Sequence, residues 1–567
     1  MPIAQQLVGA LRLCLIALTT IFYLAENLSA QQPTVGLLEY SQENQQDGYV
    51  LFAPIFSTTT YLIDKCGNQV HSWESKYKPG LSVYLLPDGS ILRAGNVNNP
   101  LFALGGGAGG IIEKIGWDGT LLWSYRISDE TMCQHHDIRP MPNGNVLAIV
   151  WEAKTYEEVI EAGRDSAKTA KIGWFEKIVE IEPTGLTTGK VVWQWSVWDH
   201  LIQDYDQENS NYGAIADAPG RINMNYIPSA NPNSSEWIHS NSIDYNLELD
   251  QILISAYNFN EIWIIDHSTT TQEATSNSGG KYGKGGDLLY RWGNPIAYNR
   301  GTETDRKLFG QHSAHWIPTG LTDAGKIIIF NNGASRNQMK YSSIDIIEPP
   351  IDAYGNYTFE SNKPFAPDKL YWTYADEIPI SFFAPNYSGA QRLPNGNTLI
   401  CSGPTGFFCE ITPNNQKVWQ YKNPVSIVGI AKQGSSIAGN SVFRAELYPS
   451  DFQGLAGRDI SQGKPIELDP YSSLCTTSSV ATEDKTNDYL IFPNPVEDFL
   501  QVRCPENNSQ YREFSLINSL GNIVINQMAS SNAGFSTINV SDIPAGMYAL
   551  KITNHSNTIV KKVVIMK

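Results

Sequence analysis

The sequence predicts an all-β protein, a six-bladed β-propeller followed by a small C-terminal β-sandwich. Aromatic residues make up 11% of the 567-residue chain and charged residues only 17%, while glycine and proline are frequent, with 46 and 31 copies. This composition is typical of many short strands joined by turns. A phrase of about four short strands, closed by a Trp or Tyr, also recurs along the chain, and this is the sequence pattern of propeller blades.

The repeated phrase has two parts. The first is a strand that leads into a tight turn, written PDG at 87–89 and PNG at 142–144 and 394–396, with altered forms near Tyr245 and Pro318. The second is an apolar strand, a turn and an aromatic strand, found at 61–73, 111–125, 178–195, 262–293 and 409–421. Residues 369–374 supply the closing strand of the unit that begins at His312, and residues 441–448 complete the ring. Six blades are therefore predicted, with five or seven as alternatives.

The first thirty residues predict the compartment. Arg12 precedes an apolar run, and small residues follow at 27–30, as in a secretory signal peptide. An uncleaved membrane anchor is the alternative, but the run is shorter than a bilayer span, so no stable membrane span is expected after cleavage. The formal net charge of −17 and the lack of a run of Lys and Arg argue against a nucleic-acid partner.

The composition divides the chain into four parts: a signal peptide at 1–30, the propeller at 31–468, a linker at 469–489 and a C-terminal domain at 490–567. The linker is rich in Ser and Thr and shows no periodicity. The C-terminal domain consists of short alternating strands with turn residues between them, as in a β-sandwich. Two segments interrupt the propeller pattern, at 155–172 and 199–235, and each is either a lid or a surface excursion.

Six cysteines remain once Cys14 is removed with the signal peptide. An even number in an exported protein permits disulfide bonds. Cys401 and Cys409 flank the turn SGPTGFF almost symmetrically, which would make them neighbours across a hairpin. We therefore predict a disulfide bond between Cys401 and Cys409.

Three histidines occupy one equivalent position of the repeat. His136, His239 and His312 each lie six residues before the turn position, where other repeats have Leu81 and Ser388. Around a propeller axis these imidazoles would converge, and three of them at one equivalent position indicate a functional site more than a structural role.

Strand alternation predicts which neighbours share the face of these histidines. Asn241 and Arg392 belong to that face, whereas His135, Arg139 and His315 belong to the other. His312 and His315 are therefore expected to point apart. Three imidazoles could also hold zinc, but Asp137 is the only acidic residue in the histidine motifs, so no metal is expected.

Much of residues 48–468 resembles the aryl-sulfate sulfotransferases, six-bladed propeller enzymes of the bacterial cell envelope. The similar motifs are GYVLFAPIFSTTTYLIDKCGNQVHSW, HHDIRPMPNGNVL, WIHSNSIDYN, QHSAHW followed by IIIFNNG, and SGAQRLPNGNTLI. The resemblance implies that His312 is the nucleophile, that His239 and Asn241 form the HxN motif, and that His136 is the histidine of the HHD motif. It also implies transfer of a sulfuryl group from a phenolic sulfate ester, through a sulfohistidine, to a second phenol. No cofactor is expected.

The sequence departs from the family pattern at two positions. Tyr257 stands where the family has an arginine that binds the sulfuryl oxygens, and Asn331 stands where its FDNG phrase has an aspartate. A phenol hydroxyl donates one hydrogen bond but carries no charge. Arg336 or Arg392 could compensate. Asn241, Tyr257, Asn331, Arg336 and Arg392 are therefore the candidate substrate-binding residues.

The C-terminal domain resembles the sorting domain of cargo of the type IX secretion system of Bacteroidetes. The similar text is FPNPVEDFLQV, the LGN turn, DIPAGMYALKI and the final KKVVIMK. The resemblance implies a delivery tag that engages the secretion machinery and is then removed. Export to the periplasm and then type IX secretion would place the protein at the cell surface or outside the cell.

Two other function classes remain alternatives. A non-catalytic propeller that binds a sulfated or aromatic ligand is favoured by the tyrosine at position 257. A quinone-dependent dehydrogenase would need cofactor and calcium sites, and neither has a visible counterpart in the sequence.

Overall fold

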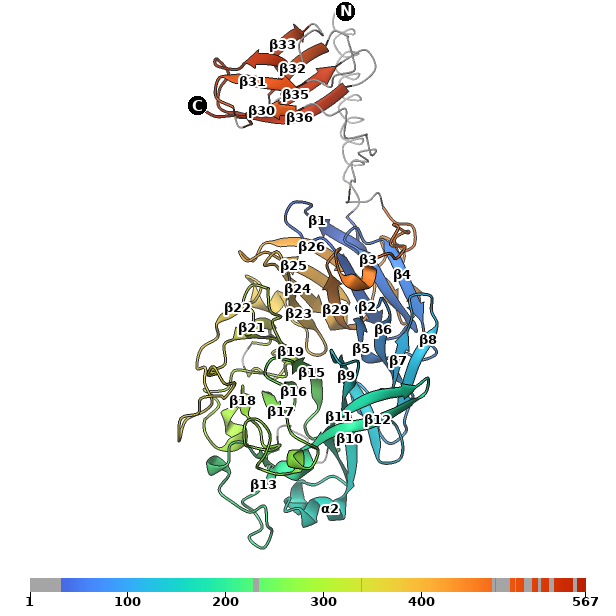
Figure 1. The fold of residues 1–567 in the computed structure, drawn as a ribbon, viewed down its shortest axis with the longest axis vertical. Coiled ribbons are helices and arrows are strands. Elements are labelled where there is room, and N and C mark those ends of the chain that lie inside the picture. Colours follow the sequence, from blue (N-terminus) through green and yellow to red (C-terminus); the bar gives the residue numbers. More distant parts are fainter. Residues whose placement is uncertain are drawn as a thin grey trace, which may run out of the picture. The chain divides into compact units, whose positions relative to one another are not determined.

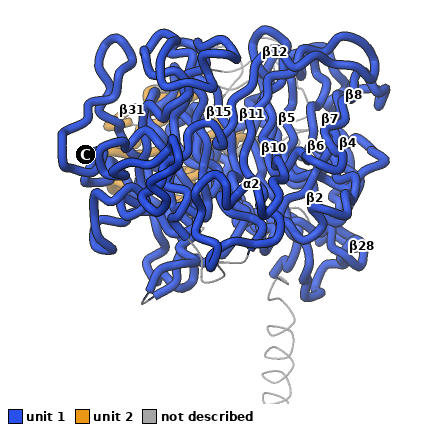
Figure 2. Tube along the Cα trace, turned by 90° about the horizontal axis from the view of Figure 1, so that it is seen from below, with its two compact units in different colours: residues 1–475 blue, residues 476–567 orange. Residues whose placement is uncertain are grey.

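The computed structural model describes residues 32–227, 234–337, 339–471, 475, 490–494, 496–503, 512–518, 522–529, 535–553 and 558–567. The chain divides into two compact units, Met1–Cys475 and Thr476–Lys567, coloured separately in Figure 2. The predicted signal peptide, most of the predicted linker and Cys504 lie outside the described residues. None of the described helices is long and apolar enough to cross a membrane.

The described part of the first unit contains six antiparallel sheets of four or five strands. Sheet 1 contains β29 (Val442–Tyr448), β2 (Tyr49–Pro54), β3 (Thr59–Asp64) and β4 (Gln69–Glu74). Sheet 2 contains β5 (Pro79–Leu85), β6 (Ile91–Asn96), β7 (Gly110–Ile115) and β8 (Leu121–Arg126). Sheet 3 contains β9 (Met132–Pro140), β10 (Val146–Thr155), β11 (Ile172–Gly185) and β12 (Thr188–Ser196).

The next three sheets follow the same order of strands. Sheet 4 contains β15 (Ser240–Asn246), β16 (Gln251–Ala256), β17 (Glu261–Asp266) and β18 (Tyr290–Trp292). Sheet 5 contains β19 (His312–Trp316), β20 (Ile327–Asn331), β21 (Ser343–Ile347) and β22 (Trp372–Tyr374). Sheet 6 contains β23 (Gly389–Arg392), β24 (Thr398–Ser402), β25 (Phe407–Ile411), β26 (Lys417–Lys422) and β1 (Gly36–Tyr40).

One strand at the edge of each sheet contacts its counterpart in the next sheet. These strands are β29, β5, β9, β15, β19 and β23, and β23 in turn contacts β29. We call them the inner strands. The two ends of the unit are tied into this arrangement, because β29 pairs with β2 and β1 pairs with β26 (Figure 1). Residues far apart in the sequence therefore share sheets 1 and 6.

The aromatic strand that ends most of the repeats binds the neighbouring sheet through tryptophan. Each of these indole N–H groups donates to a backbone carbonyl beyond its own sheet: Trp73 to Gly116, Trp123 to Thr188, Trp195 to Gly286, Trp292 to Pro367 and Trp419 to Lys65. The five side chains are almost completely buried. Burying the ring and satisfying its single donor together explain why the repeat keeps an aromatic residue there.

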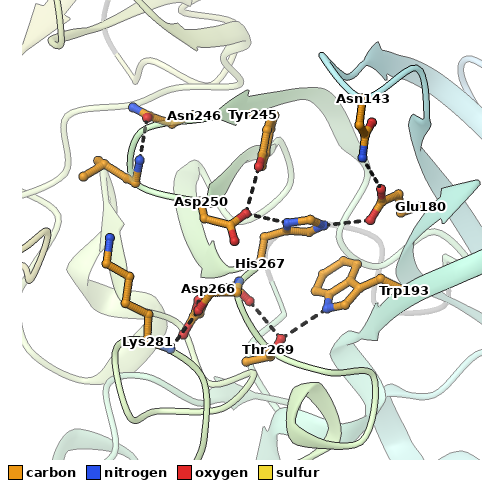
Figure 3. A network of polar contacts seen from close by, with 12 residues as sticks. Asn143, Glu180, Trp193, Tyr245, Asn246, Asp250, Asp266, His267, Thr269 and Lys281 are labelled. Carbon is orange, nitrogen blue, oxygen red and sulfur yellow. Dashed lines mark hydrogen bonds and ion pairs between the residues drawn. The ribbon is translucent and has the colours of Figure 1, made fainter.

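Sheets 3 and 4 are joined by His267, which follows β17 (Figure 3). Its Nδ1 lies 2.7 Å from Asp250 Oδ1 and its Nε2 lies 3.1 Å from Glu180 Oε2. Burial lowers the pKa of His267, but the two carboxylates outweigh burial and raise it to about 9. His267 is thus an imidazolium that links β11 to sheet 4.

The two insertions pack beside the same pair of sheets. The first carries α2 (Tyr156–Glu161), which begins with a capping box between Thr155 and Glu158. The second carries β13 (Leu201–Ile202) and β14 (Ile222–Asn223). Their apolar side chains join the core formed by sheets 3 and 4: Val159, Leu201, Ile202, Ile215, Ile222 and Met224. Another small ladder pairs β27 (Val425–Ser426) with β28 (Gly429–Ile430). The described 3₁₀-helices span 166–168, 197–200, 215–217, 273–275, 295–298, 379–381, 403–405 and 453–455.

The predicted disulfide bond between Cys401 and Cys409 is wrong. Cys401 pairs with Phe408 and Cys409 with Ile400, so the two cysteines are one position out of register on adjacent strands. Side chains one position apart point to opposite faces of a sheet. Both thiols are free and buried, and the disulfide bond joins Cys66 to Cys475 instead.

The second unit has two antiparallel sheets around one apolar core. One contains β30 (Leu490–Phe492), β31 (Phe499–Arg503) and β34 (Phe535–Asn539). The other contains β32 (Arg512–Ile517), β33 (Ile523–Ala529), β35 (Gly546–Thr553) and β36 (Thr558–Ile565). Alternate side chains of both sheets are buried between them, including Leu500, Ile538, Leu516 and Leu550.

Candidate functional site

The inner strands are interrupted at the histidine positions. His136 and His239 have positive φ angles of 51° and 58°, and Ser313, next to His312, has 53°. At or just after each of these positions the pairing with the second strand of the sheet shifts register. Leu81 and Ser388, at the equivalent positions, also have positive φ. A left-handed residue other than glycine costs about 1–3 kcal/mol, and such strain concentrates at functional sites.

The interruptions bring the three predicted histidines together. The ring centroids of His136 and His239 are 4.5 Å apart, those of His239 and Tyr257 are 5.0 Å apart, and those of Tyr257 and His312 are 5.2 Å apart. We call these four residues the histidine cluster. Tyr257, which the sequence predicts to stand in place of the family arginine, lies between His239 and His312.

His312 is held by an asparagine that the sequence argument did not select. Its Nδ1 lies 2.8 Å from Asn332 Oδ1, and the amide nitrogen of Asn332 donates to the carbonyls of Ala384 and Tyr387. These two acceptors fix the amide orientation, so Nδ1 of His312 must donate to the amide oxygen. Burial lowers the pKa of His312 to about 3. The imidazole is therefore neutral, with its proton on Nδ1 and a lone pair on Nε2.

Asn331 has a structural role. It donates to the Lys307 carbonyl and to Asp345, and its side-chain oxygen accepts from the backbone N–H of Phe309. The asparagine that contacts His312 is its neighbour, because β20 ends at Asn331 and Asn332 follows the strand. The sequence does show two adjacent asparagines at this point. Strand alternation alone does not tell which of them contacts His312.

His239 is paired with a carboxylate. Its Nδ1 lies 2.6 Å from Oε1 of Glu236, three residues earlier. This contact orients the ring and leaves Nε2 as the nitrogen that can exchange a proton with a ligand. Glu236 lies in the loop before β15, and no repeat pattern singled it out.

His135 was predicted to point away from His136, and this prediction is wrong. The Nδ1 atoms of the two rings are 2.9 Å apart, because the left-handed turn at His136 breaks the alternation of the strand. Burial lowers the pKa of both histidines well below the ordinary value. Nε2 of His135 lies 4.0 Å from Glu176, whose pKa burial raises to about 8. All three groups are therefore uncharged near neutral pH.

A glycine-rich loop lies against the histidine cluster. A Cβ added at Gly106 would come within 3.0 Å of His239, and one at Gly107 within 2.5 Å of His136. Gly107 has a φ of +84° and its carbonyl accepts from the backbone N–H of His136. Only glycine allows this backbone to approach both imidazoles so closely.

The other candidate residues differ in whether they lie beside the histidine cluster. Asn241 is buried and donates to the Gln311 carbonyl, next to His312. Arg336 lies over the rings of Phe309 and Tyr341, and Arg392 is paired with Asp323 at 2.7 Å. Within the described residues, neither guanidinium contacts a histidine of the cluster. Arg444, which the sequence argument missed, acts on His312 through its charge.

The described residues contain no group of three or more His, Cys, Asp or Glu side chains arranged to hold a metal ion. The cluster combines instead a neutral, oriented imidazole, a second imidazole on a carboxylate and a phenol. Such a set can provide a nucleophile, a proton carrier and hydrogen-bond donors.

Comparison with known protein families shows the family of this chain. Residues 106–438, more than half of the chain, match the family model described as arylsulfotransferase (ASST). The chain belongs to the arylsulfotransferase family. The match includes all four residues of the histidine cluster and Asn332, whereas Arg444 lies beyond its end.

The second unit matches a different family model. Residues 490–566 match the secretion system C-terminal sorting domain. This domain implies engagement with the type IX secretion machinery and export to the cell surface or the outside. A comparison with curated proteins found no match.

Among solved structures, the similarities are distant. A protein of unknown function from Bacteroides caccae is 12% identical, with 70% of this chain and 98% of that chain covered and a TM-score of 0.37. A streptogramin B lyase is also 12% identical, with 74% and 95% covered and a TM-score of 0.33. A catalytically inactive virginiamycin B lyase from Staphylococcus aureus, crystallised with quinupristin, is 12% identical, with 66% and 85% covered and a TM-score of 0.29.

Proposed function

We propose that this protein is a sulfotransferase that moves a sulfuryl group from a phenolic sulfate ester to a phenol through a sulfohistidine at His312. Membership of the arylsulfotransferase family supports the reaction class. The observation that carries the assignment is the bond between His312 and Asn332, because it leaves a neutral imidazole with its lone pair on Nε2. A neutral imidazole is a nitrogen nucleophile near neutral pH.

The first step forms a bond between Nε2 of His312 and sulfur and breaks the bond between sulfur and the phenolic oxygen. The phenolate leaves with the electron pair and takes a proton from Nε2 of His239. The sulfated ring keeps its proton on Nδ1 and becomes cationic, and the oxygen of Asn332 stabilises that charge. In the second step the oxygen of an acceptor phenol attacks sulfur, the bond between sulfur and Nε2 of His312 breaks with its electron pair returning to Nε2, and the phenol proton goes to Nε2 of His239, so both histidines regain their starting states.

The sulfuryl oxygens would be bound by uncharged donors. Burial raises the pKa of Tyr257, so this residue stays a phenol and can donate one hydrogen bond. If Nδ1–H of His135 donates to Nδ1 of His136, the proton of His136 lies on Nε2. This N–H group would donate a second hydrogen bond to the sulfuryl oxygens. Asn241 is a third candidate donor. Sulfuryl transfer resembles phosphoryl transfer in needing position and charge stabilisation above all, and this site would supply less charge than one with the family arginine.

We also propose that the six sheets are the blades of a six-bladed propeller. The cyclic order of contacts among the inner strands supports a closed ring, and the C-terminal β29 in sheet 1 supports closure by strand pairing. The tryptophan hydrogen bonds also support a closed ring, because they link sheet 1 to sheet 2, sheet 2 to sheet 3, and sheet 6 back to sheet 1. The histidine cluster would then lie near the propeller axis.

The domain plan completes the proposal. Residues 1–30 would direct export to the periplasm, residues 469–489 would link the two units, and the sorting domain would then take the protein through the type IX system. Mass spectrometry of the secreted protein tests this plan, since it predicts a mature chain that begins near position 31 and lacks residues 490–567.

The activity test is an assay with 4-nitrophenyl sulfate and phenol as acceptor. The wild type should release 4-nitrophenolate in amounts that match the phenyl sulfate formed, and His312→Ala should lose at least 10³-fold in kcat, as expected for loss of a nucleophile. His71→Gln is a matched control, because His71 stacks on Trp117 away from the cluster and should leave kcat unchanged. Normal turnover by His312→Ala would reject the nucleophile.

A non-catalytic ligand-binding propeller is the second candidate, favoured by the uncharged Tyr257 in place of the arginine. It predicts that the wild type binds 4-nitrophenyl sulfate in a titration and releases no 4-nitrophenolate. Restoring the arginine separates the two candidates further, since Tyr257→Arg should raise the turnover of an enzyme.

A further inference from the structure

A large cavity lies where several inner strands lead into their turns. Its volume is about 1190 Å³, and it is lined by the turns that follow β5, β9 and β19 and by parts of β23 and β29. None of the residues of the histidine cluster lines it. The two sites approach each other at Ser313, where a Cβ on Gly389 would lie 2.9 Å from Ser313 Oγ and 3.1 Å from Arg444 Cγ. Ser313, Gly389 and Arg444 all line the cavity, whereas His312 does not.

Two arginines face this cavity with their carboxylates behind them. Nη2 of Arg139 lies 2.9 Å from Asp244 Oδ1, and Nη2 of Arg444 lies 2.6 Å from Asp137 Oδ1. Both aspartates are almost fully buried and do not line the cavity, whereas both arginines do. Within the described residues, the other guanidinium nitrogens of Arg139 and Arg444 make no hydrogen bond to the protein. Planar N–H donors are therefore presented to the cavity.

The remaining charges near these arginines are few. Glu446 lines the cavity and accepts from the hydroxyl of Tyr448 at 3.0 Å. Burial raises the pKa of Glu446, which the two arginines oppose. His315 also lines the cavity and is neutral, because burial lowers its pKa. Arg392 is paired with Asp323, and Lys114 with Asp88. Arg139 and Arg444 are themselves paired with Asp244 and Asp137, so they offer a ligand their remaining N–H groups, and the carboxylates among the lining residues are Asp88, Glu182 and Glu446.

Apolar and aromatic side chains also line this cavity. Residues of this kind in the lining include Leu86, Trp123, Met141, Trp316, Leu321 and Phe452. A binding cavity of this composition suits a ligand with an apolar body and one anionic group, because the guanidinium fork matches carboxylate and sulfonate oxygens.

We propose that this cavity is a second ligand site that binds an aromatic monoanion, with the anionic group on Arg139 and Arg444 and the ring against Trp316. The site is separate from the histidine cluster and does not depend on the transfer reaction. An aryl carboxylate and an aryl sulfonate share this chemistry, so both serve as probes.

The test is isothermal titration of the full chain with 2-naphthoate and with 2-naphthalenesulfonate. Both should bind with saturation, whereas the neutral 2-naphthalenemethanol should bind at least tenfold more weakly. Arg139→Gln should weaken binding of both anions at least tenfold. Arg126→Gln, which removes an exposed arginine of β8 outside the cavity, should leave binding unchanged.

A second variant guards against loss of folding in Arg139→Gln. Glu446→Gln is nearly isosteric, keeps an acceptor for Tyr448 and removes a lining carboxylate that interacts with both arginines, so it should tighten binding of both anions severalfold. His312→Ala should leave binding unchanged. Equal affinity for the neutral probe, weaker binding in Glu446→Gln, or loss of binding in His312→Ala would each overturn the proposal.

Discussion

Asn332 decides which nitrogen of His312 carries the proton, because its amide is fixed by two backbone acceptors. A free imidazole divides its proton between two nitrogens and hydrogen-bonds through either one. Here the amide oxygen of Asn332 faces Nδ1 and can only accept a hydrogen bond. Nδ1 therefore carries the proton, and the lone pair lies on Nε2. Orientation and protonation state are thus set by a neutral partner, and the ring stays unprotonated because it is buried.

The first prediction follows from this bond. Asn332→Leu keeps the volume of the side chain but removes the acceptor, so we expect kcat for 4-nitrophenyl sulfate to fall by about 10²-fold as the wrong tautomer becomes populated. The carbonyls of Ala384 and Tyr387 also lose the hydrogen bond from Asn332, which should cost about 1–3 kcal/mol of stability. Steady-state kinetics and urea unfolding separate the two effects, and a folded variant with wild-type kcat would contradict the role of Asn332.

The residues of the site differ in how far the sequence could predict them. His136, His239 and His312 were predictable because the repeat places them at one position, and the structure brings them together. Glu236 and Glu176 were not, because they act on the histidines from outside the repeated turn. The predicted disulfide bond between Cys401 and Cys409 rested on their symmetric spacing around a turn. A register offset of one residue places their side chains on opposite faces of the sheet, and the sequence does not show this offset.

At the scale of the element, the irregular backbone of the inner strands decides where the histidine side chains lie. Strict alternation would leave His135 and His136 on opposite faces, yet a left-handed residue and a register shift bring their Nδ1 atoms together. The same interruption recurs in sheets 4 and 5. Strand periodicity predicts the strands well, but a bulge depends on backbone conformation that residue types alone do not reveal.

The glycine-rich loop over the cluster gives the second prediction. In Gly107→Ala the new methyl group would meet His136 at 2.5 Å, so the loop or the imidazole must move. We expect kcat/KM to fall at least tenfold because the geometry of the cluster changes. Gly119→Ala is the matched control, since Gly119 has a nearly identical φ of +81° but no atom within 4 Å of the added methyl group.

The control variant Gly119→Ala introduces the unfavourable left-handed backbone conformation without a steric clash. Both substitutions should lose about 1–2 kcal/mol of stability from the left-handed conformation, which thermal unfolding would measure. Only Gly107→Ala should lose activity. Equal kcat/KM values for the two variants would show that the loop does not need its close approach to His136.

At the scale of the whole first unit, stability depends on joints between sheets that lie far apart in the sequence. Strand β29 completes sheet 1, Trp419 binds the carbonyl of Lys65, and Lys65 pairs with Glu410 at 2.6 Å. The sequence predicted that residues 441–448 complete the ring, and the structure pairs β29 with β2. The ion pairs of these joints were not predictable, because their partners are up to several hundred residues apart.

The third prediction concerns the joint between sheets 3 and 4 at His267 (Figure 3). Its pKa is about 9 in the folded protein against about 6.5 in an unfolded chain, so the folded state holds the proton more tightly. The stabilisation is fully present below pH 6.5 and is lost as the pH rises through 9. The difference in pKa corresponds to about 3 kcal/mol.

His267→Gln removes the cation and leaves Glu180 and Asp250 without it. Urea unfolding should therefore show the variant to be less stable by about 3 kcal/mol at pH 6, and this difference should shrink towards zero by pH 10, where the wild-type imidazole is neutral as well. Comparing the two proteins at each pH cancels the titration of Lys and Tyr side chains elsewhere. A difference that stays constant between pH 6 and pH 10 would mean that His267 supports the joint by packing against Trp193 and Tyr245 and not by its charge.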